Sequence, residues 1–333
     1  MNKKVCGIDV SYKTFDVEFM VNGKTTFKKD YTNDLKGHKA FSKKLIKMQI
    51  THVCLEATGN YHLDIALMVD AINEVKLMVI NPRIAHNYSK VLNQKAKTDS
   101  EDAHVLAHYA AHMEYFKWQA PDEILFSIRA CGRRLSQITK QATKLKNQKH
   151  AYETTKATPK FIILDVELSI NNLENQRNSL IENTLKIISE HKKAQRMYDL
   201  ITGIDGFSTK TAIKLIGELA VLDSEMKANQ LVAHAGLNPT IFKSGKSINK
   251  KSRLSKAGNK YIREALYMSA MQMTYRNKNV AAYYEHMQND NGLKKMQAIC
   301  AIMRKILMAI HGMIRDNVEF NANKFYKISE NKR

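Results

Sequence analysis

Two aspartates on one short segment, Asp99 and Asp102, are spaced for chemistry on a helix. Thr98 and Glu101 have the arrangement of a capping box, which predicts that a helix begins here. Residues three apart share a helix face, and apolar residues continue this face: Ala103, Leu106, Ala107 and Ala110. Acids at a helix start also complement the helix dipole, but carboxylates beside a buried face need a cationic partner. A metal ion and an Arg or Lys side chain are both candidates for that partner.

Two further acids lie on predicted strands. Asp9 is in the strand predicted over residues 4–10, and Glu56 ends the strand predicted over residues 53–56. Either acid alone could be a solvated strand-end residue. Together with the helical pair they form a set of four carboxylates, which can hold two divalent cations about 4 Å apart on a phosphodiester. Oxygen-only ligands favour Mg²⁺ or Mn²⁺ over zinc.

The elements that would position these acids can be predicted from periodicity. Alternating or continuous apolar residues predict strands over residues 4–10, 14–21, 25–31, 53–56 and 76–80, with a hairpin turn at Asn22-Gly23. Helices are expected over residues 35–48 and 61–72 and from Asp99 to near residue 115. Three meandering strands followed by alternating helices and strands predict an α/β domain with a mixed sheet over residues 1–117.

The middle of the chain has a different character. Residues 118–195 are polar, with scattered Leu and Ile, and Pro159 alone interrupts them after residue 121. This pattern predicts two long helices that form an antiparallel or intermolecular coiled-coil arm, with lysines that could contact a polyanion. Residues 196–325 are predicted to be mainly helical. Their Gly203-Ile204-x-Gly206 turn is either a simple glycine turn or a helix-hairpin-helix-like turn that holds a phosphate.

A strongly basic segment runs from Pro239 to Arg263. Its Lys and Arg side chains are Lys243, Lys246, Lys250, Lys251, Arg253, Lys256, Lys260 and Arg263, and it contains no acid. A charge run is usually a solvated face. An acid-free run that also contains Ser244-Gly245 and Gly258-Asn259 is more typical of a loop that grips phosphates.

The composition points to a polyanionic partner. The 333 residues include 53 Lys and Arg against 32 Asp and Glu, a formal net charge of +21, which favours nucleic acid over an acidic membrane. No uninterrupted apolar run approaches the roughly 20 residues of a membrane span. The four cysteines lack metal-site spacing and are typical of a reduced, cytoplasmic protein without membrane contact.

These motifs together resemble those of a known family. Gly7-Ile8-Asp9-Val10-Ser11, Glu56-Ala57-Thr58-Gly59, Asn81-Pro82 and the Asp99-x-x-Asp102 segment are similar to motifs of DEDD insertion-sequence transposases, the group that includes the Piv-type DNA invertases. Motifs of the second half, among them Ala235-Gly236-Leu237-x-Pro239 and Lys256-x-Gly258-Asn259, resemble that family's C-terminal domain. The resemblance implies an RNase H-like domain of RuvC type, then a helical insertion, then a helical domain.

The resemblance also implies a mechanism. Asp9, Glu56, Asp99 and Asp102 would bind Mg²⁺ or Mn²⁺, and Ser244 would attack the DNA phosphate to form a covalent phosphoserine. From the residues alone Ser247, Ser252 and Ser255 compete with Ser244, and only the resemblance favours it. The family further implies double-stranded donor and target DNA, a noncoding guide RNA from the element, and a dimer or tetramer.

Two other functions fit the same residues. A RuvC-like junction endonuclease would use water as its nucleophile, and Ser244 would then be dispensable. A nucleic-acid-binding protein without catalysis would keep the charge and the fold, but the presence of all four acids disfavours it.

Overall fold

The structure is a computed structural model of the whole chain. It describes all residues except 1–2, 58, 60, 93–98, 119, 121, 245–247 and 329–333, and the side chains of 99–100, 241–244 and 248–252 also lie outside the description. The chain divides into two compact units, Met1–Ala120 and Pro121–Arg333. The finer division at residues 117 and 195 stays a prediction.

The first unit is built on a mixed five-stranded sheet in the order β3-β2-β1-β4-β5. The strands are β1 (Lys4–Val10), β2 (Thr14–Val21), β3 (Lys24–Thr32), β4 (His52–Glu56) and β5 (Lys76–Ile80). β1 pairs antiparallel with β2 and parallel with β4, which confirms the predicted mixed sheet. Asn22 and Gly23 both have positive φ, as a tight hairpin turn requires. This sheet is compatible with an RNase H-like domain.

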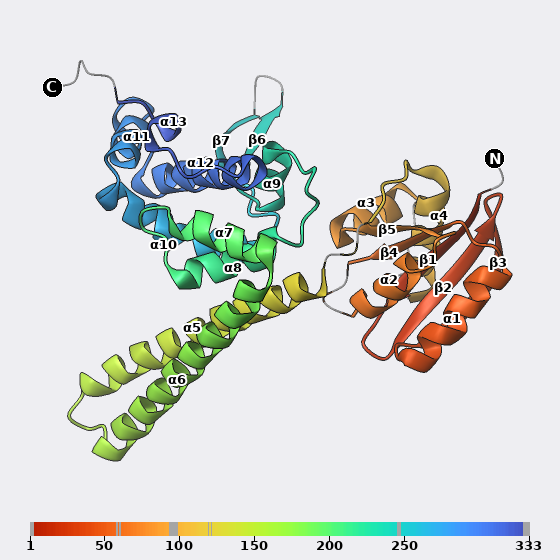
Figure 1. Cartoon of the computed structure of the whole chain (residues 1–333), viewed down its shortest axis with the longest axis horizontal. Helices are drawn as coiled ribbons and strands as arrows, with labels where there is room; N and C mark the ends of the chain where they lie inside the picture. Colours follow the sequence, from red (N-terminus) through yellow and green to blue (C-terminus); the bar gives the residue numbers. More distant parts are fainter. Residues whose placement is uncertain are drawn as a thin grey trace. The chain divides into compact units, whose positions relative to one another are not determined.

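Helices cover both faces of the sheet (Figure 1). They are α1 (Leu35–Lys47), α2 (Leu63–Asp70), α3 (Pro82–Val91) and α4 (Asp99–His112). One apolar cluster joins α1 and α2 to the sheet, and another joins α3 and α4 to its opposite face. α3 is not among the predicted helices, although Asn81 caps it and Pro82 occupies its first turn, both standard helix-start signals.

The closest approach in this unit is between α4 and β1. A Cβ atom at Gly7 would lie 2.1 Å from the Ala103 carbonyl oxygen and 2.2 Å from the Ala107 amide nitrogen. Only glycine allows the helix backbone to rest this closely on the strand. Ala103, Leu106, Ala107 and Ala110 are all buried, as the predicted apolar face requires.

A buried carboxylate ties α4 to β2. The Glu18 side chain is fully buried. It forms an ion pair with Lys28 Nζ at 2.8 Å, accepts a hydrogen bond from Thr25 Oγ1, and contacts His104 Nδ1 at 2.7 Å. Burial alone would raise the pKa of this carboxyl, but the bonds from Lys28, Thr25 and His104 outweigh it and lower the pKa. Glu18 is therefore an ionised group that fastens the helix across the sheet.

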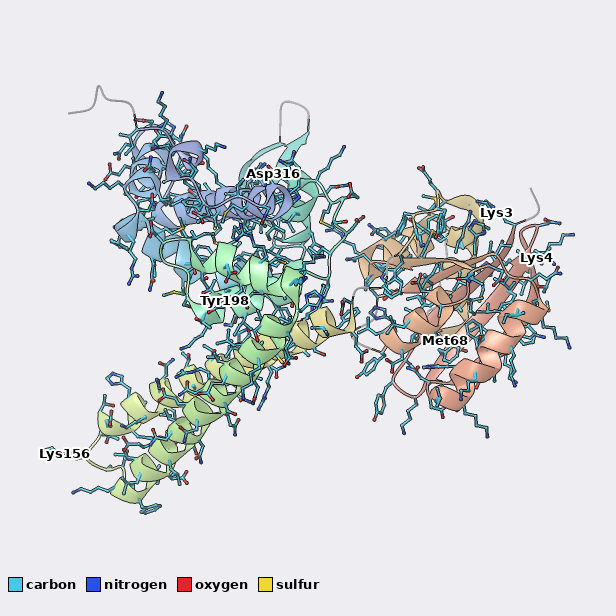
Figure 2. The ribbon with its side chains drawn as sticks, in the orientation of Figure 1. Lys3, Lys4, Met68, Lys156, Tyr198 and Asp316 are labelled. Atoms are coloured by element: carbon cyan, nitrogen blue, oxygen red, sulfur yellow. The ribbon has the colours of Figure 1, made fainter. Side chains whose placement is uncertain are left out.

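The second unit begins with a long antiparallel helical arm (Figure 1). Its helices are α5 (Glu123–Glu153) and α6 (Lys160–Glu190), as the two-helix prediction requires. They pack through buried Val166 and Ile170 of α6 and are bridged by Lys146–Glu174 at 2.7 Å. Lys156 lies at the far end of the arm, and its side chain is drawn with the other sticks there in Figure 2.

The rest of this unit is mainly helical. Its helices are α7 (Lys192–Thr202), α8 (Thr209–Leu219), α9 (Ala228–His234), α10 (Lys260–Arg276), α11 (Lys278–Asn289), α12 (Lys295–Asp316) and α13 (Ala322–Phe325). Among the described residues, one helix, α12, is long and apolar enough to cross a membrane. A search for uninterrupted apolar runs does not find it, because Arg304 and Lys305 interrupt it. Its apolar face, including Ile302, Ile306 and Ile310, is buried in the core of the unit.

The basic segment forms strands where the sequence analysis predicts a loop. β6 (Pro239–Ser244) and β7 (Ile248–Leu254) pair antiparallel as a two-stranded sheet. Residues 239–244 and 248–254 are therefore strands and not loop, while phosphate binding by this segment stays a prediction. The apolar residues Ile241, Phe242 and Ile248 were the available strand signal, but four lysines and Arg253 within residues 239–254 weakened it.

The contact between α4 and β1 gives a first prediction. Gly7→Ala should destabilise the first unit by about 2–3 kcal/mol, because the added methyl group forces α4 away from the sheet. Urea unfolding monitored by circular dichroism measures the change. Gly312→Ala is the control, because that position lies in helix α12 with open space around its Cβ, and it should be neutral or stabilising. Equal stability of the Gly7→Ala protein and the wild type would contradict the close packing.

Candidate active site

Two of the predicted acids lie on neighbouring parallel strands. The register pairs Gly7 with Cys54 and Ile8 with Leu55, so Asp9 and Glu56 follow one step further along β1 and β4. Ile8 and Leu55 are in the cluster beneath α1 and α2. Because side chains alternate along a strand, Asp9 and Glu56 point to the opposite face, the one that α4 covers. Both are partly buried.

The helical acids approach the same end of these strands. Ala103 and Ala107 lie against Gly7, while Leu106 and Ala110 pack in the cluster that contains Val5. The helix therefore begins near the carboxyl ends of β1 and β4 and runs back along the sheet. Asp102, which is partly buried, comes one residue before Ala103 and so lies at the end of the helix nearest the strand acids. The side chain of Asp99, at the first helical position, lies outside the described side chains, as does its predicted cap, Thr98.

The chemistry of these acids fits a divalent cation. All of them offer carboxylate oxygens, the ligands that Mg²⁺ and Mn²⁺ prefer. Asp9, Glu56 and Asp102 come from three elements that meet at one edge of the sheet. Within the described part of the chain, no three His, Cys, Asp or Glu side chains are grouped closely enough to hold a metal ion. A complete ion site would therefore need Asp99, or a closer approach of the three described acids.

Two polar neighbours of this edge are absent from the sequence-predicted set. Asp16 is directly opposite Asp9 in the antiparallel pair of β1 and β2, so their side chains share a face. His104, two residues after Asp102, holds the buried Glu18. Asp16 and Glu18 are two residues apart and therefore lie on the same face of β2, which is the signal that could have identified them. Because they alternate with Phe15, Val17 and Phe19, that face has the pattern of a solvent-exposed one.

Ser244 is the last residue of β6 and is paired with Ile248 across the hairpin. Its side chain, and those of Lys243, Lys250 and Lys251, lie outside the described side chains. Lys246 and Ser247 lie in residues 245–247, outside the description altogether. The remaining predicted cations, Arg253, Lys256 and Lys260, are exposed.

The base of the hairpin is closed by hydrogen bonds between the residues before β6 and after β7. Ser255 Oγ donates to Asn238 Oδ1 at 2.7 Å, and the Ser255 amide donates to the Asn238 carbonyl at 2.9 Å. The Lys256 amide donates to the Gly236 carbonyl at 3.1 Å, and the Asn259 amide to the His234 carbonyl at 2.7 Å. Ser255, one of the competing serines, therefore has a structural partner in this closure.

Glycine is needed at this closure. A Cβ atom at Gly258 would lie 2.3 Å from the His234 carbonyl oxygen, and Gly258 has φ of 153°. Arg263 Nη1 donates to the carbonyls of Ala235 at 2.8 Å and Gly258 at 3.1 Å, which joins the two sides. The glycines of both C-terminal motifs thus lie where the chain enters and leaves the hairpin.

A buried carboxylate anchors the closure to the helical core. The Glu218 side chain on α8 is 2% exposed, and it accepts from Arg133 Nε at 2.7 Å and from Asn259 Nδ2 at 2.7 Å. Arg129 Nε lies 3.3 Å from Glu218 Oε2, the oxygen that also accepts from Asn259. Burial would raise the pKa of Glu218, but Arg133, Arg129 and Asn259 together lower it. Asn259 also caps α10, so one side chain joins the hairpin, α8 and α10.

The glycine turn between α7 and α8 has a packing role. Gly206 has φ of 83°, and a Cβ atom there would lie 3.3 Å from Gln272 Cβ on α10. Gly203 is the C-cap of α7, and its amide bonds the Asp199 carbonyl at 3.1 Å. These contacts give a structural reason for both glycines, and phosphate binding by this turn stays a prediction.

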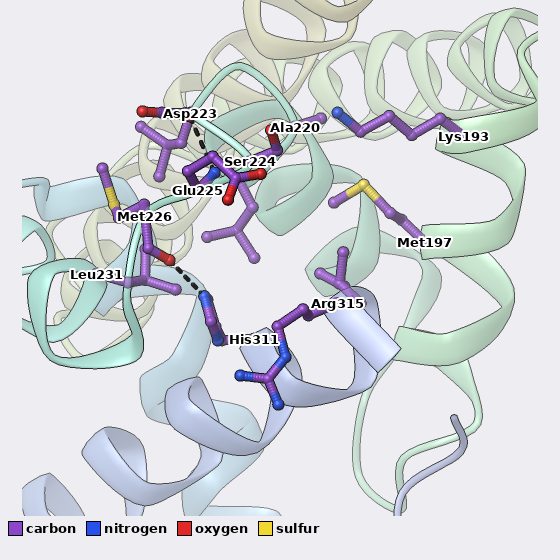
Figure 3. Close-up of a pocket in the computed structure, with 13 residues that line it drawn as sticks. Lys193, Met197, Ala220, Asp223, Ser224, Glu225, Met226, Leu231, His311 and Arg315 are labelled. Carbon is purple, nitrogen blue, oxygen red and sulfur yellow. Dashed lines mark hydrogen bonds between the residues drawn. The ribbon is translucent and has the colours of Figure 1, made fainter. Parts of the chain in front are cut away.

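A pocket of about 330 Å³ lies elsewhere in the second unit (Figure 3). It has an apolar floor that includes Met197 and Leu231, and His311 Nε2 lies 2.6 Å from the Met226 carbonyl at its edge. Its lining contains none of the acids, serines or basic residues predicted for the site. The pocket is therefore not part of the candidate site.

Comparison with known proteins agrees with both halves of the chain. A family model described as a transposase, with DEDD and IS110 in its name, matches residues 6–152, and one described as the transposase IS116/IS110/IS902 family matches residues 198–285. Pilin gene-inverting proteins of Moraxella bovis and Moraxella lacunata are each 28% identical, and each match covers 96% of this chain and 98% of the relative. An insertion element IS110 protein of 43.6 kDa from Streptomyces coelicolor is 26% identical over 45% of this chain and 34% of its own length. The chain therefore belongs to the IS110-type transposases, a family of DNA recombinases.

Proposed function

We propose that this protein breaks and rejoins DNA by transesterification, with Asp9, Glu56, Asp99 and Asp102 as the metal-binding acids and Ser244 as the nucleophile. The observation that carries the proposal is that three of these acids lie on elements that come together at one edge of the sheet, within a segment that matches a DEDD transposase family. The order of the elements supports the assignment of Asp99, which begins the same helix as Asp102.

The acids have a defined task in this proposal. They would hold Mg²⁺ or Mn²⁺, and the bound ions would neutralise the phosphate and stabilise the attacking and leaving oxygens. The chain's own contribution is to fix the carboxylates: the β1–β4 register sets Asp9 against Glu56, and the contact at Gly7 sets the depth of α4. The contact between His104 on α4 and Glu18 on β2 fixes the position of the same helix across the sheet.

Ser244 would supply the attacking oxygen. A bond forms between Ser244 Oγ and phosphorus while the bond from phosphorus to the leaving sugar oxygen breaks. The proton of the serine hydroxyl is transferred to that sugar oxygen. One phosphoester bond replaces another, so rejoining needs no external energy. The closure at Asn238, Ser255 and Asn259 supports this role, because it holds the strand that ends in Ser244.

The partners follow from the same proposal. The substrate is double-stranded DNA, as the family and the inversion named for the Moraxella relatives suggest. A noncoding guide RNA is part of the proposal by family resemblance, and the net charge of +21 is consistent with a second polyanion. A dimer or tetramer would allow two duplexes to be cut and rejoined together.

Loss of an acid should stop the chemistry and spare binding. Asp102→Asn should lower recombination by more than about 100-fold, because an amide oxygen cannot replace an ionised carboxylate on the metal. Affinity for DNA should change little, and chelation by EDTA should reproduce the loss. Asp30→Asn is the control, since Asp30 lies in the same row of the sheet as Asp9 and Asp16 but is exposed on the edge strand. Full recombination by the Asp102→Asn protein, or in EDTA, would contradict the role of the acids.

The nucleophile can be tested separately. Ser244→Ala should abolish covalent attachment to DNA, because it removes the attacking oxygen while the acids stay intact. Denaturing gel electrophoresis of labelled DNA after reaction detects the protein–DNA adduct. Ser247→Ala is the matched control and should retain the adduct. Normal nicking by the Ser244→Ala protein would identify water as the nucleophile and favour the junction-endonuclease function.

The anchor of the hairpin predicts a pH-dependent stability. Glu218→Gln should cost about 3 kcal/mol, because it leaves Arg129 and Arg133 without their buried counter-charge. Since the folded-state pKa of Glu218 is lowered, its stabilisation is present above the unfolded pKa of about 4.3 and is lost as pH falls through the folded pKa. The wild type should therefore lose its advantage over the variant on acidification.

Urea unfolding at several pH values measures this difference. Glu167→Gln is the control, because Glu167 is 47% exposed and pairs with Lys149 at 3.2 Å on the surface of the arm. That exchange should cost less than about 1 kcal/mol. A pH-independent difference between the wild type and the Glu218→Gln protein would show that Glu218 is not ionised in the folded state.

A further inference from the structure

Outside the hairpin, the second unit gathers cations where the arm meets α8. We define the basic patch as Lys140 and Lys146 of α5, Arg177 of α6, and Lys210 and Lys214 of α8. These residues come from three helices and are spread over 75 positions of the sequence, so no local sequence pattern groups them. α5 packs against both α6 and α8, which brings them together.

At one side of the patch, three cations surround a single acid. Lys146 Nζ bonds Glu174 Oε1 at 2.7 Å. This hydrogen bond and the charges of Lys146, Arg177 and Lys210 lower the pKa of the partly exposed Glu174 carboxyl. For Lys210, burial and then the charges of Arg177 and Lys146 lower the ammonium pKa. One carboxylate is thus too little negative charge for its three neighbours.

The Arg177 side chain has a hydrogen-bond donor that lacks an acceptor among the described residues. Its Nε is buried, and within the described part of the chain it has no hydrogen-bond acceptor. A buried guanidinium nitrogen normally finds an acceptor in the protein, in water or in a ligand. Phosphate oxygens suit a guanidinium especially well, because they accept charge-assisted bonds from its fork.

The other side of the patch repeats the pattern. Lys140 Nζ lies 2.5 Å from Glu264 Oε2, and Lys214 Nζ lies 3.6 Å from Glu264 Oε1. The Lys214 side chain is 12% exposed, and burial lowers the pKa of its ammonium group despite Glu264. Two acids therefore face five cations across the whole patch.

We propose that the basic patch is a second DNA-binding surface, which holds the sugar-phosphate backbone of a duplex independently of base sequence. Lys140 to Lys146 spans about 9 Å of α5, which matches about three phosphates of one strand. Lys and Arg side chains contact phosphates, which both strands of a duplex present, and these contacts carry no base sequence information. Taking DNA as the ligand rests on the proposed function, but none of these residues belongs to the acids or the hairpin.

Salt-dependent binding of duplex DNA of arbitrary sequence tests the proposal. In the full chain, the triple variant Lys146→Gln, Arg177→Gln, Lys210→Gln should reduce the slope of log affinity against log salt by about 2.7, at about 0.9 for each lost phosphate contact. The control triple variant Lys278→Gln, Lys295→Gln, Lys324→Gln removes the same charge from exposed positions on α11, α12 and α13. It should leave the slope within about one unit of the wild type.

Substitution of the acid Glu174 should have the opposite effect on DNA binding. A gain in affinity cannot be explained by misfolding of the variant. Glu174→Gln should tighten DNA binding, because the phosphate no longer competes with a carboxylate for Lys146. Equal slopes for the two triple variants, or no gain from Glu174→Gln, would overturn the proposal. A slope change seen with duplex RNA and not with DNA would overturn the choice of DNA.

The experiment separates this surface from the proposed catalysis. At saturating DNA the triple variant of the patch should still form the covalent adduct, because Ser244 and the acids are unchanged. If the wild type forms no adduct while the slopes still differ, the catalytic proposal fails and the binding surface stands.

Discussion

The first unit depends on the contact between α4 and Gly7 of β1. The helix backbone lies so close to the strand that even a methyl group would clash with Ala103 and Ala107. This depth determines where Asp102 stands relative to Asp9 and Glu56, because all three are fixed by elements packed on one face. Glu18 adds a lateral constraint through His104. The acids are thus held by packing and by the contact between the buried Glu18 carboxylate and His104, whereas a flexible loop would leave their separation variable.

In the second unit, a buried charge fixes the position of the β6–β7 hairpin. A two-stranded hairpin is only marginally stable by itself, and the strand that ends in Ser244 belongs to such a hairpin. Asn259 and Arg263 fix its base, and Glu218 connects that base to α8 and α5. Burying Glu218 is costly without partners, but two arginines and an amide satisfy it. Such a network is specific in geometry, as the proposed role of the Ser244 hydroxyl would require.

Much of this fold could be predicted from the sequence, since local patterns decide it. β1, β2 and β5 have the predicted bounds, the Asn22-Gly23 turn has the expected backbone, and the break near Pro159 separates two long helices. The β6–β7 hairpin and the burial of Glu18 and Glu218 escaped prediction, because they depend on partners distant in the chain: a charged residue in an alternating pattern looks solvated until α4 or α5 covers it. Ser244 was singled out only by family resemblance, as its chemistry does not differ from that of Ser247 or Ser252.

The central claim is that the acids and Ser244 act in one reaction, and the covalent intermediate tests it most directly. Digestion of the trapped protein–DNA adduct followed by mass spectrometry of the DNA-linked peptide identifies the attached residue. The account predicts that the wild-type adduct is on Ser244, and that the Asp102→Asn protein gives none under the same conditions. An adduct on another residue, an undiminished adduct in the Asp102→Asn protein, or DNA cleavage by the wild type without any adduct would contradict it.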